Sequence, residues 1–550
     1  MPHSLSPSSK AMPPSAIPEG EPAAPAIPSG QPADEDVTMA DAVTVDVDMG
    51  SETVADDNTD APVPAKIEPP EVKLEDLFAG VNSDDDDEEF PSSHNLPDKT
   101  SPSSPGSPSS PSDGGPSLQG SNPALMRTFY QRLFPWRYLF QWLNHSPTPT
   151  DDFKHREFAF TLQNDAYLRY QAFVSSDTFV YPVLHHLPYA NPKFRLRKDV
   201  LRLMPSRFEI GPVYSANPRD RKTFRSSTAF RPLSKELCFD IDLTDYDDVR
   251  TCCDKANICN KCWQFITMAV KVVDVALRDD FGFKHILWVY SGRRGAHAWV
   301  CDKKARTMDD IKRKAIAGYL EVVRGGAQSG KKVNVRRPLH PHLTRSLDIL
   351  KNHFQEDVLE AQDPWKSPEQ ADKLLQLLPD RELADALRKK WDSSPGRAST
   401  SKWADIDTIA KTSASKNLDP KVLLDAKQDV VLEYTYPRLD IEVSKKLNHL
   451  LKSPFVVHPG TGRVCVPIDT RLLEEFNPLN VPTVQGLIQE IDTWTEPEEA
   501  PAHPSQQDWE KTSLKPYIEY FRGFVVALMK DERDVKVKRE REEQADSLDF

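Results

Sequence analysis

The stretch ELCFDIDLTDYDDVR, residues 236–250, decides the fold class of this chain. Its first half alternates in the manner of a buried strand, with Leu237 and Phe239 predicted to point into a core. Asp240 and Asp242 then lie together on the other face, because residues two apart in a strand share a side. Paired carboxylates repel each other unless a cation lies between them. The pattern predicts a metal-binding strand, with a merely solvated strand end as the simpler alternative.

A third carboxylate, Asp440, lies in YPRLDIEV, which we expect to be another apolar strand. Mg²⁺ and Mn²⁺ are hard ions that prefer oxygen ligands in octahedral geometry. They are commonly bound by one or two carboxylates together with the phosphates of a substrate. Three such carboxylates are enough to hold two ions.

The segment SGRRGAH joins the predicted strands HILWVY and HAWVC. Its glycines allow the backbone to turn and approach a ligand, and its arginines offer planar forks to phosphate oxygens. A solvated basic turn is the alternative. The residues concerned are Ser291, Gly292, Arg293, Arg294, Gly295 and His297. Lys452 and His458 form a similar cationic pair soon after Asp440, unless they are an exposed lysine and an ordinary strand histidine.

Four of the seven cysteines lie close together, in the pattern C-C-x5-C-x2-C. The last pair has ordinary zinc-ligand spacing, whereas neighbouring side chains such as those of the first pair tend to diverge. A redox Cys-x2-Cys is the rival interpretation. The four are Cys252, Cys253, Cys259 and Cys262; Cys238, Cys301 and Cys465 are predicted core residues.

Charge is distributed unevenly along the chain. Residues 1–122 hold 24 acidic and 4 basic residues, which leaves 60 acidic and 66 basic in the rest, so the net charge of −14 divides into −20 and +6. A segment so polar and proline-rich cannot bury enough apolar surface to offset its chain entropy, and we expect it to be disordered. No apolar run approaches the ~18 residues of a membrane span. We expect a soluble intracellular protein with no membrane contact.

The remaining chain alternates between strand-like and helix-like periodicity, which predicts an α/β fold. We expect a helix interrupted by Pro135, a hairpin in REFAFTLQNDAYLRYQAF, a strand in VVLEYTYPRLDIEV and a hairpin turning at 459–462. The predicted units are the tail 1–122, a first core part 123–305 with the cysteine motif 252–262, a helical insertion 306–429, a second core part 430–492, and a linker with a charged helix 493–550.

These motifs, taken in order from HREFAFTL to PRLDIEVSKKLNHLLKSPFVVHPGTGR, resemble the small catalytic subunits of eukaryotic DNA primase, within the archaeo-eukaryotic primase superfamily. The resemblance covers roughly residues 126–491. It implies an α/β (α+β) catalytic core with mixed sheets, a small zinc motif and an inserted all-α subdomain. The long N-terminal tail has no counterpart in the family's usual pattern.

The resemblance also implies roles for individual residues. It makes Asp240, Asp242 and Asp440 the catalytic metal ligands, Glu157 a further active-site carboxylate, and the four cysteines ligands of a structural zinc ion. The implied nucleotide contacts are Arg169, Ser291, Gly292, Arg293, Arg294, Gly295, His297, His449, Lys452 and His458.

The implied activity is RNA primer synthesis from ribonucleoside triphosphates on a single-stranded DNA template, with two Mg²⁺ or Mn²⁺ ions. The family further implies a heterodimer with an iron–sulfur large subunit, attachment to DNA polymerase alpha, and a nuclear location. Two alternatives are a primase-polymerase of the same superfamily that uses deoxynucleotides, and a non-catalytic, zinc-stabilised scaffold that binds nucleic acid.

Overall fold

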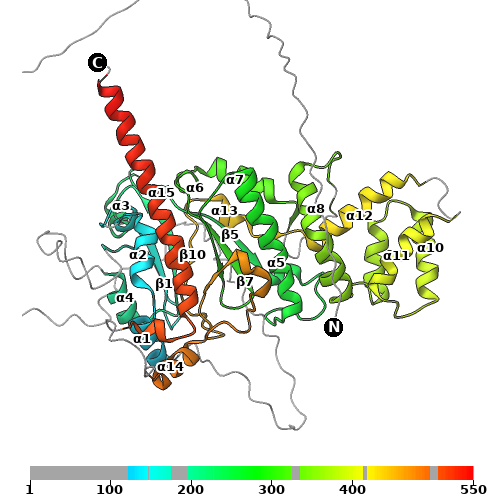
Figure 1. The fold of residues 1–550 in the computed structure, drawn as a ribbon, viewed down its shortest axis with the longest axis horizontal. Coiled ribbons are helices and arrows are strands. Elements are labelled where there is room, and N and C mark those ends of the chain that lie inside the picture. The colour runs from blue at the N-terminus through cyan, green and yellow to red at the C-terminus, as the bar shows by residue number, and fades with distance from the viewer. Residues whose placement is uncertain are drawn as a thin grey trace, which may run out of the picture. The chain divides into compact units, whose positions relative to one another are not determined.

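The computed structural model describes residues 122–548, apart from 147, 175–194, 227, 325–332, 334, 413–417 and 496–505 (Figure 1). The predicted disordered tail lies outside the described residues except for Asn122, and so does most of the predicted linker after Thr493.

The first of two larger sheets has the strand order β10-β3-β1-β2, with β4 paired to β3. The predicted hairpin is confirmed, because β1 and β2 pair antiparallel with Phe158 opposite Gln171. The strands are β1 (Arg156–Thr161), β2 (Tyr167–Gln171), β3 (Arg207–Tyr214), β4 (Pro232–Ser234) and β10 (Leu451–Lys452).

The second sheet has the order β11-β6-β7-β5 and carries the stretch that opened the sequence analysis. Leu237, Phe239 and Ile241 are fully buried, as their alternation predicts. The β5 strand pairs antiparallel with β7, placing Asp240 opposite His297. Its strands are β5 (Leu237–Asp242), β6 (Ile286–Tyr290), β7 (Gly295–Val300) and β11 (Pro467–Ile468).

Both larger sheets are antiparallel throughout rather than mixed. Short connections such as the one between β6 and β7 permit only antiparallel pairing, since a parallel pair needs a long crossover. Within the described residues the parallel pairing is that of β8 (Val323–Arg324) with β9 (Arg438–Leu439).

The helices that flank the sheets begin at the first described residues. Asn122 caps α1 by accepting a hydrogen bond from the N–H of Ala124 at 3.0 Å, and Pro135 separates α1 from α2 as predicted. The helix α5 continues into one π-helical turn, η6 (Ala276–Asp280). These helices are α1 (Pro123–Arg132), α2 (Trp136–Asn144), α3 (Asp151–Lys154), α4 (Leu196–Leu203), η4 (Pro218–Thr223), η5 (Leu243–Tyr246), α5 (Asn260–Val275) and α6 (Lys303–Arg306).

Beyond residue 306 the described elements are helical up to Thr435, except for β8. They are α7 (Asp310–Leu320), α8 (Pro341–His353), η7 (Phe354–Glu360), α9 (Pro368–Leu377), α10 (Arg381–Asp392), α11 (Ser399–Ala410) and α12 (Pro420–Thr435). In Figure 1 the yellow helices α10, α11 and α12 lie together at one side of the two sheets.

The strand expected in VVLEYTYPRLDIEV is wrong over most of its length. Its first six residues belong to α12, which ends just before Tyr436 because the residue preceding Pro437 is forced out of the helical region. Only Arg438 and Leu439 form a strand, and α13 (Ile441–Lys445) follows at once. Asp440 therefore begins a helix instead of lying within a strand.

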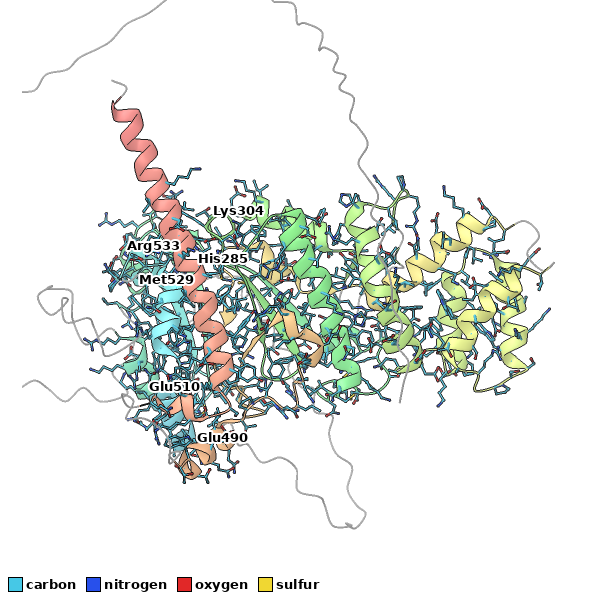
Figure 2. All side chains as sticks on the ribbon, in the orientation of Figure 1. His285, Lys304, Glu490, Glu510, Met529 and Arg533 are labelled. Carbon is cyan, nitrogen blue, oxygen red and sulfur yellow. The ribbon has the colours of Figure 1, made fainter. Side chains whose placement is uncertain are left out.

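The C-terminal part supplies η9 (Thr470–Glu475), α14 (Val484–Thr493), η10 (Asp508–Lys511) and the predicted long helix α15 (Lys515–Leu548). The hairpin at 459–462 is present in irregular form, as a single bridge between Val457 and Val464. The helix α15 packs along α2, where Phe521 meets Trp142 edge to face at 5.8 Å. Figure 2 shows His285 beside this helix, and its Nε2 lies 3.0 Å from Asp531.

A buried ion pair joins the two larger sheets. The guanidinium of Arg156 on β1 donates to both oxygens of Glu236, just before β5, at 2.8 and 3.1 Å. Both side chains are at most 1% exposed. Burial alone would raise the pKa of Glu236, but Arg156 and His145 lower it to about 2. The pair fixes the edge of one sheet against the other.

We expect R156A to lower the free energy of unfolding by about 3–5 kcal/mol, because it leaves the Glu236 carboxylate buried without its partner. Urea unfolding followed by tryptophan fluorescence measures the loss. The control is R132A, which breaks the exposed pair between Arg132 and Asp508 and is expected to cost under about 1 kcal/mol. Equal losses in the two variants would contradict the role assigned to the buried pair.

Candidate active site and zinc centre

Asp240 and Asp242 end β5 on the side facing the SGRRGAH loop. Asp240 is 3% exposed, and its Oδ1 lies 3.4 Å from Nε2 of His297 on the neighbouring β7. Asp242 accepts from Nε of Arg294 at 2.7 and 2.9 Å and from the N–H and hydroxyl of Thr244 at 2.9 Å each. Arg294 from the loop thus already offsets the charge of Asp242, while His297 of β7 lies beside Asp240.

Asp440 reaches the first of these residues through its backbone. Its N–H donates to the backbone carbonyl of Asp240 at 3.1 Å, and its own carboxylate caps α13 by accepting from the N–H of Glu442 at 3.0 Å. Burial raises the pKa of Asp440. The structure therefore places Asp440 next to Asp240 along the backbone, on a helix N-cap and not on the expected strand.

Arg438 holds this junction in place. Its side chain is 1% exposed, and it donates to the carbonyl of Asp245 at 2.7 Å and to the carboxylate of Asp248. Its N–H donates to the hydroxyl of Tyr246 at 3.0 Å. These hydrogen bonds join the segment that carries Asp440 to the segment that follows Asp242. They are made by Arg438, two residues before Asp440.

Asp245 is a fourth carboxylate at the site that the sequence reasoning missed. Burial, followed by the negative charges of Asp242 and Asp440, raises the pKa of Asp245 to about 7. The available signal was the acid-rich TDYDD that follows the strand. Carboxylate oxygens are the ligands that Mg²⁺ and Mn²⁺ prefer, so the chemistry of these side chains fits such an ion. Among the described residues, however, only the four clustered cysteines have three or more potential ligand atoms within 4.8 Å of one another.

The SGRRGAH loop packs against the segment that carries His458. Gly292 has a φ of +91°, and a Cβ there would lie 2.6 Å from Cβ of His458. Gly295 is equally constrained, since a Cβ would lie 2.2 Å from the carbonyl oxygen of Ile241. Ser291 closes the loop by accepting from the N–H of Gly295 at 3.0 Å. Both glycines are required by close contact within the protein itself.

Lys452, on β10, reaches the same loop, and His449 lies just before that strand. Lys452 is 5% exposed and donates to the carbonyl of Ser291 at 3.1 Å, while burial lowers the pKa of its ammonium. The His449 carbonyl accepts from Lys235, and burial together with Lys235 and Arg169 lowers the pKa of His449 to about 3. The structure thus brings Lys452 to the loop, on which Arg293 is partly exposed, whereas His449 lies beside Lys235.

Glu157 and Arg169 lie on the first sheet, next to this group. Glu157 is fully buried and accepts from Nε of Arg169 at 3.0 Å and from the hydroxyl of Tyr214 at 3.1 Å. A Cβ placed on Gly211 would touch both Glu157 and Leu450, at 3.1 and 3.3 Å. Glu157 is therefore a neighbour of the 449–452 segment, and its hydrogen-bond partners are Arg169, Tyr170 and Tyr214 rather than any of the three aspartates.

The four clustered cysteines converge at the start of α5. Their sulfur atoms all lie within 4.8 Å of one another, with Sγ of Cys259 at 3.5 Å from that of Cys252 and 3.9 Å from that of Cys262. Zn–S bonds of about 2.3 Å in a tetrahedron separate the sulfurs by about 3.8 Å, so these residues fit zinc. The adjacent pair converges despite the expected divergence. Cys238, Cys301 and Cys465 are buried core residues, as predicted.

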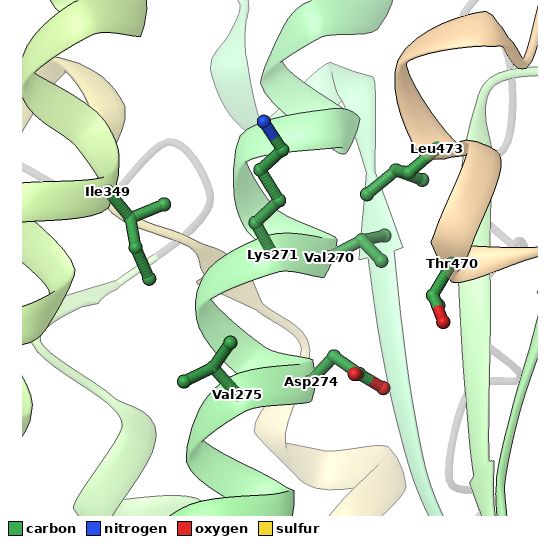
Figure 3. Close-up of a pocket in the computed structure, with 7 residues that line it drawn as sticks. All are labelled: Val270, Lys271, Asp274, Val275, Ile349, Thr470 and Leu473. Atoms are coloured by element: carbon green, nitrogen blue, oxygen red, sulfur yellow. The ribbon is translucent and has the colours of Figure 1, made fainter. Parts of the chain in front are cut away.

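A cavity of about 400 Å³ lies elsewhere, between α5, α8 and η9 (Figure 3). It is lined by Val270, Lys271, Asp274, Val275, Ile349, Thr470 and Leu473, none of which is a predicted site residue. The ammonium of Lys271 forms hydrogen bonds there with His353, at 2.9 Å, and with Glu474.

No described helix is both long enough and apolar enough to cross a membrane.

Carboxylates at the end of a strand, beside a glycine- and arginine-containing loop, are the kind of arrangement used by enzymes that transfer nucleotides with the help of metal ions. A family model described as DNA primase small subunit matches residues 239–470. The chain is 55% identical to the DNA primase small subunit of Schizosaccharomyces pombe over 434 residues, covering 76% of this chain and 92% of that protein.

Two further relatives carry the same description. The protein of Saccharomyces cerevisiae is 42% identical over 439 residues, which cover 78% of this chain and 98% of that protein. The protein of Drosophila melanogaster is 36% identical over 442 residues, covering 77% and 96%. This chain belongs to the DNA primase small subunit family, which confirms the resemblance seen in its sequence motifs.

If the cysteines hold zinc, stringent chelation should increase hydrogen exchange at residues 251–262 and in the first turn of α5. The metal supplies the bonds that hold these thiolates together, and apo sites of this kind lose their fold. Elemental analysis of the untreated protein should find one zinc per chain. Unchanged exchange after complete metal removal would contradict a structural zinc site.

Proposed function

We propose that this chain is the primase catalytic subunit that joins ribonucleotides into short RNA primers on single-stranded DNA. The observation that carries the proposal is the backbone hydrogen bond from Asp440 to Asp240, which places two acidic residues from distant parts of the chain next to each other, near a loop with two arginines. The chemistry is nucleotidyl transfer, in which a 3′-hydroxyl attacks an α-phosphate in line and pyrophosphate leaves.

Asp240, Asp242 and Asp440 are the proposed ligands of two Mg²⁺ or Mn²⁺ ions, with Glu157 as an additional carboxylate in the same region. When bound, such ions activate the attacking hydroxyl and neutralise charge on the leaving oxygens. The guanidinium of Arg294 forms an ion pair with Asp242. When a metal ion replaces the guanidinium at this carboxylate, Arg294 is close enough to bind the triphosphate instead.

The triphosphate is proposed to bind where the loop and β10 meet. Fixed cationic donors in a desolvated pocket stabilise developing charge without reorganising at the moment of reaction, and Lys452 is held in this way by Ser291. The proposed contacts are Arg169, Ser291, Gly292, Arg293, Arg294, Gly295, His297, His449, Lys452 and His458.

The four clustered cysteines are proposed to bind a structural zinc ion, because four thiolates leave no open coordination position. A small primase subunit functions in a complex with other subunits. For this chain the proposed partners are an iron–sulfur large subunit and DNA polymerase alpha, and the proposed location is the nucleus. The modest charge of +6 after residue 122 supports shared rather than sole binding of the template.

The catalytic assignment predicts that D240N and D242N each reduce primer synthesis by at least about 10³-fold, because each removes a ligand worth several kcal/mol of transition-state stabilisation. Labelled ribonucleotide incorporation on single-stranded DNA measures the loss, and zinc content should not change. D385N, on an exposed face of α10, is the control. Normal synthesis by D240N or D242N would remove the metal-site argument.

The substrate assignment predicts that the purified chain, with its large subunit where that copurifies, starts primers with ribonucleotides. Supplying all eight nucleotides on a single-stranded template and digesting the product with alkali shows which sugar was used. Alkali-resistant product from the first position onward would favour the deoxynucleotide-using primase-polymerase instead. Absence of any product in the wild type would favour the non-catalytic scaffold.

A further inference from the structure

Gln362 lies just after η7, within the helical insertion, and its side chain reaches the first cysteine pair. It is 3% exposed, and its amide makes hydrogen bonds to uncharged backbone groups and to a cysteine sulfur. Nothing in the cysteine spacing or in the family motifs singles it out. The question is what a buried amide does beside four thiols.

Both ends of the Gln362 amide are used on residues 251 and 252. The Oε1 atom accepts from the N–H of Thr251 at 2.8 Å and from the N–H of Cys252 at 3.2 Å. The Nε2 atom donates to Sγ of Cys252 at 3.4 Å. The Thr251 hydroxyl also donates to the backbone carbonyl of Gln362. A carboxamide offers an acceptor for the two N–H groups at one end and a donor for the sulfur at the other.

The opposite side of the cysteine segment is attached to the catalytic strand. Arg250 donates to the carbonyls of Lys255 and Asn257 at 2.8 and 3.0 Å, between the two cysteine pairs. It also donates to Asp247 at 2.6 Å, and the second oxygen of Asp247 accepts from the N–H of Lys255 at 3.2 Å. The segment is thus held from the β5 side by Arg250 and from the insertion by Gln362.

We propose that Gln362 is a positioning residue for the zinc site, one that orients the Cys252 thiolate and ties the helical insertion to the metal. The inference rests on the zinc binding proposed above. Four thiolates give a Zn²⁺ site a net negative charge, and an N–H donor to one sulfur both stabilises that charge and fixes the sulfur lone pairs toward the metal. Partners of ligands in this role typically change metal affinity by about 10–100-fold when removed.

Substitutions at Gln362 separate this role from simple support of the backbone. Q362E keeps oxygen acceptors for Thr251 and Cys252 but replaces the N–H donor with a negative oxygen facing the sulfur. Q362M keeps the length and removes both functions. The matched control is Q355E, on the exposed face of η7. There the side chain of Gln355 donates to Glu360 at 2.8 Å.

The experiment measures zinc affinity of the full-length protein by competition with a chromogenic chelator. It also records the thiolate-to-metal charge-transfer bands after replacement of zinc by Co²⁺. We expect Q362E and Q362M to lose about 10-fold or more in affinity and to shift the Co²⁺ bands, while Q355E matches the wild type. Hydrogen exchange in η7 should rise when zinc is removed from the wild type.

Wild-type affinity and unshifted bands in Q362E, with loss only in Q362M, would overturn the proposal and leave Gln362 a backbone support. Wild-type protein that binds no zinc would overturn the zinc assignment itself, which elemental analysis distinguishes from the first outcome. Far-ultraviolet circular dichroism and urea unfolding identify any variant that fails to fold, and the Q362E result then decides.

Discussion

The backbone hydrogen bond from Asp440 to Asp240 is the constraint on which the rest of the site depends. It brings a third carboxylate to a strand that already carries two, and such crowding is unfavourable without a cation. Arg438 stabilises the junction by binding the chain just after β5, across 193 positions of sequence. Burial first, and then the negative charges of Asp242 and Asp440, raise the pKa of Asp245, so the fold holds this carboxyl where its ionised form is unfavourable. Stability elsewhere in the fold must supply that work.

The stabilising contacts of the two antiparallel sheets are of different kinds. Arg156 and Glu236 fix the sheets to each other through a buried ion pair. Neither charge is accessible to water, so water cannot take the place of its partner. The β6–β7 loop depends on close packing instead, since Gly292 and Gly295 leave no room for a Cβ. Lys452 then joins the sheets at the loop by donating to Ser291. The cationic groups are therefore positioned by the fold before any substrate arrives.

Much of this could be predicted from local sequence patterns, and the errors have physical causes. The alternation around Phe239 specifies a buried strand because one face must be apolar, and the cysteine spacing indicates a metal because thiols rarely cluster otherwise. The β-branched and aromatic residues around Val431 suggested a strand, yet Val430, Leu432, Tyr434 and Thr435 are buried in the last turns of α12, so tertiary contacts override propensity there. Asp245 and Gln362 escaped notice because their importance arises from contacts between distant segments, which no short-range pattern contains.

The segment that follows β5 is the place where these distant contacts meet. Asp245 and Asp248 bind Arg438 on the side of the metal ligands, whereas Asp247 binds Arg250 and the cysteine loop on the other. The cysteine loop and the chain around Arg438 therefore attach to the same few residues, from Asp245 in η5 to Arg250 just after it, so a displacement of one bears on the attachment of the other. We infer that the four cysteines, the proposed zinc ligands, help to hold the chain beside the proposed metal-binding aspartates.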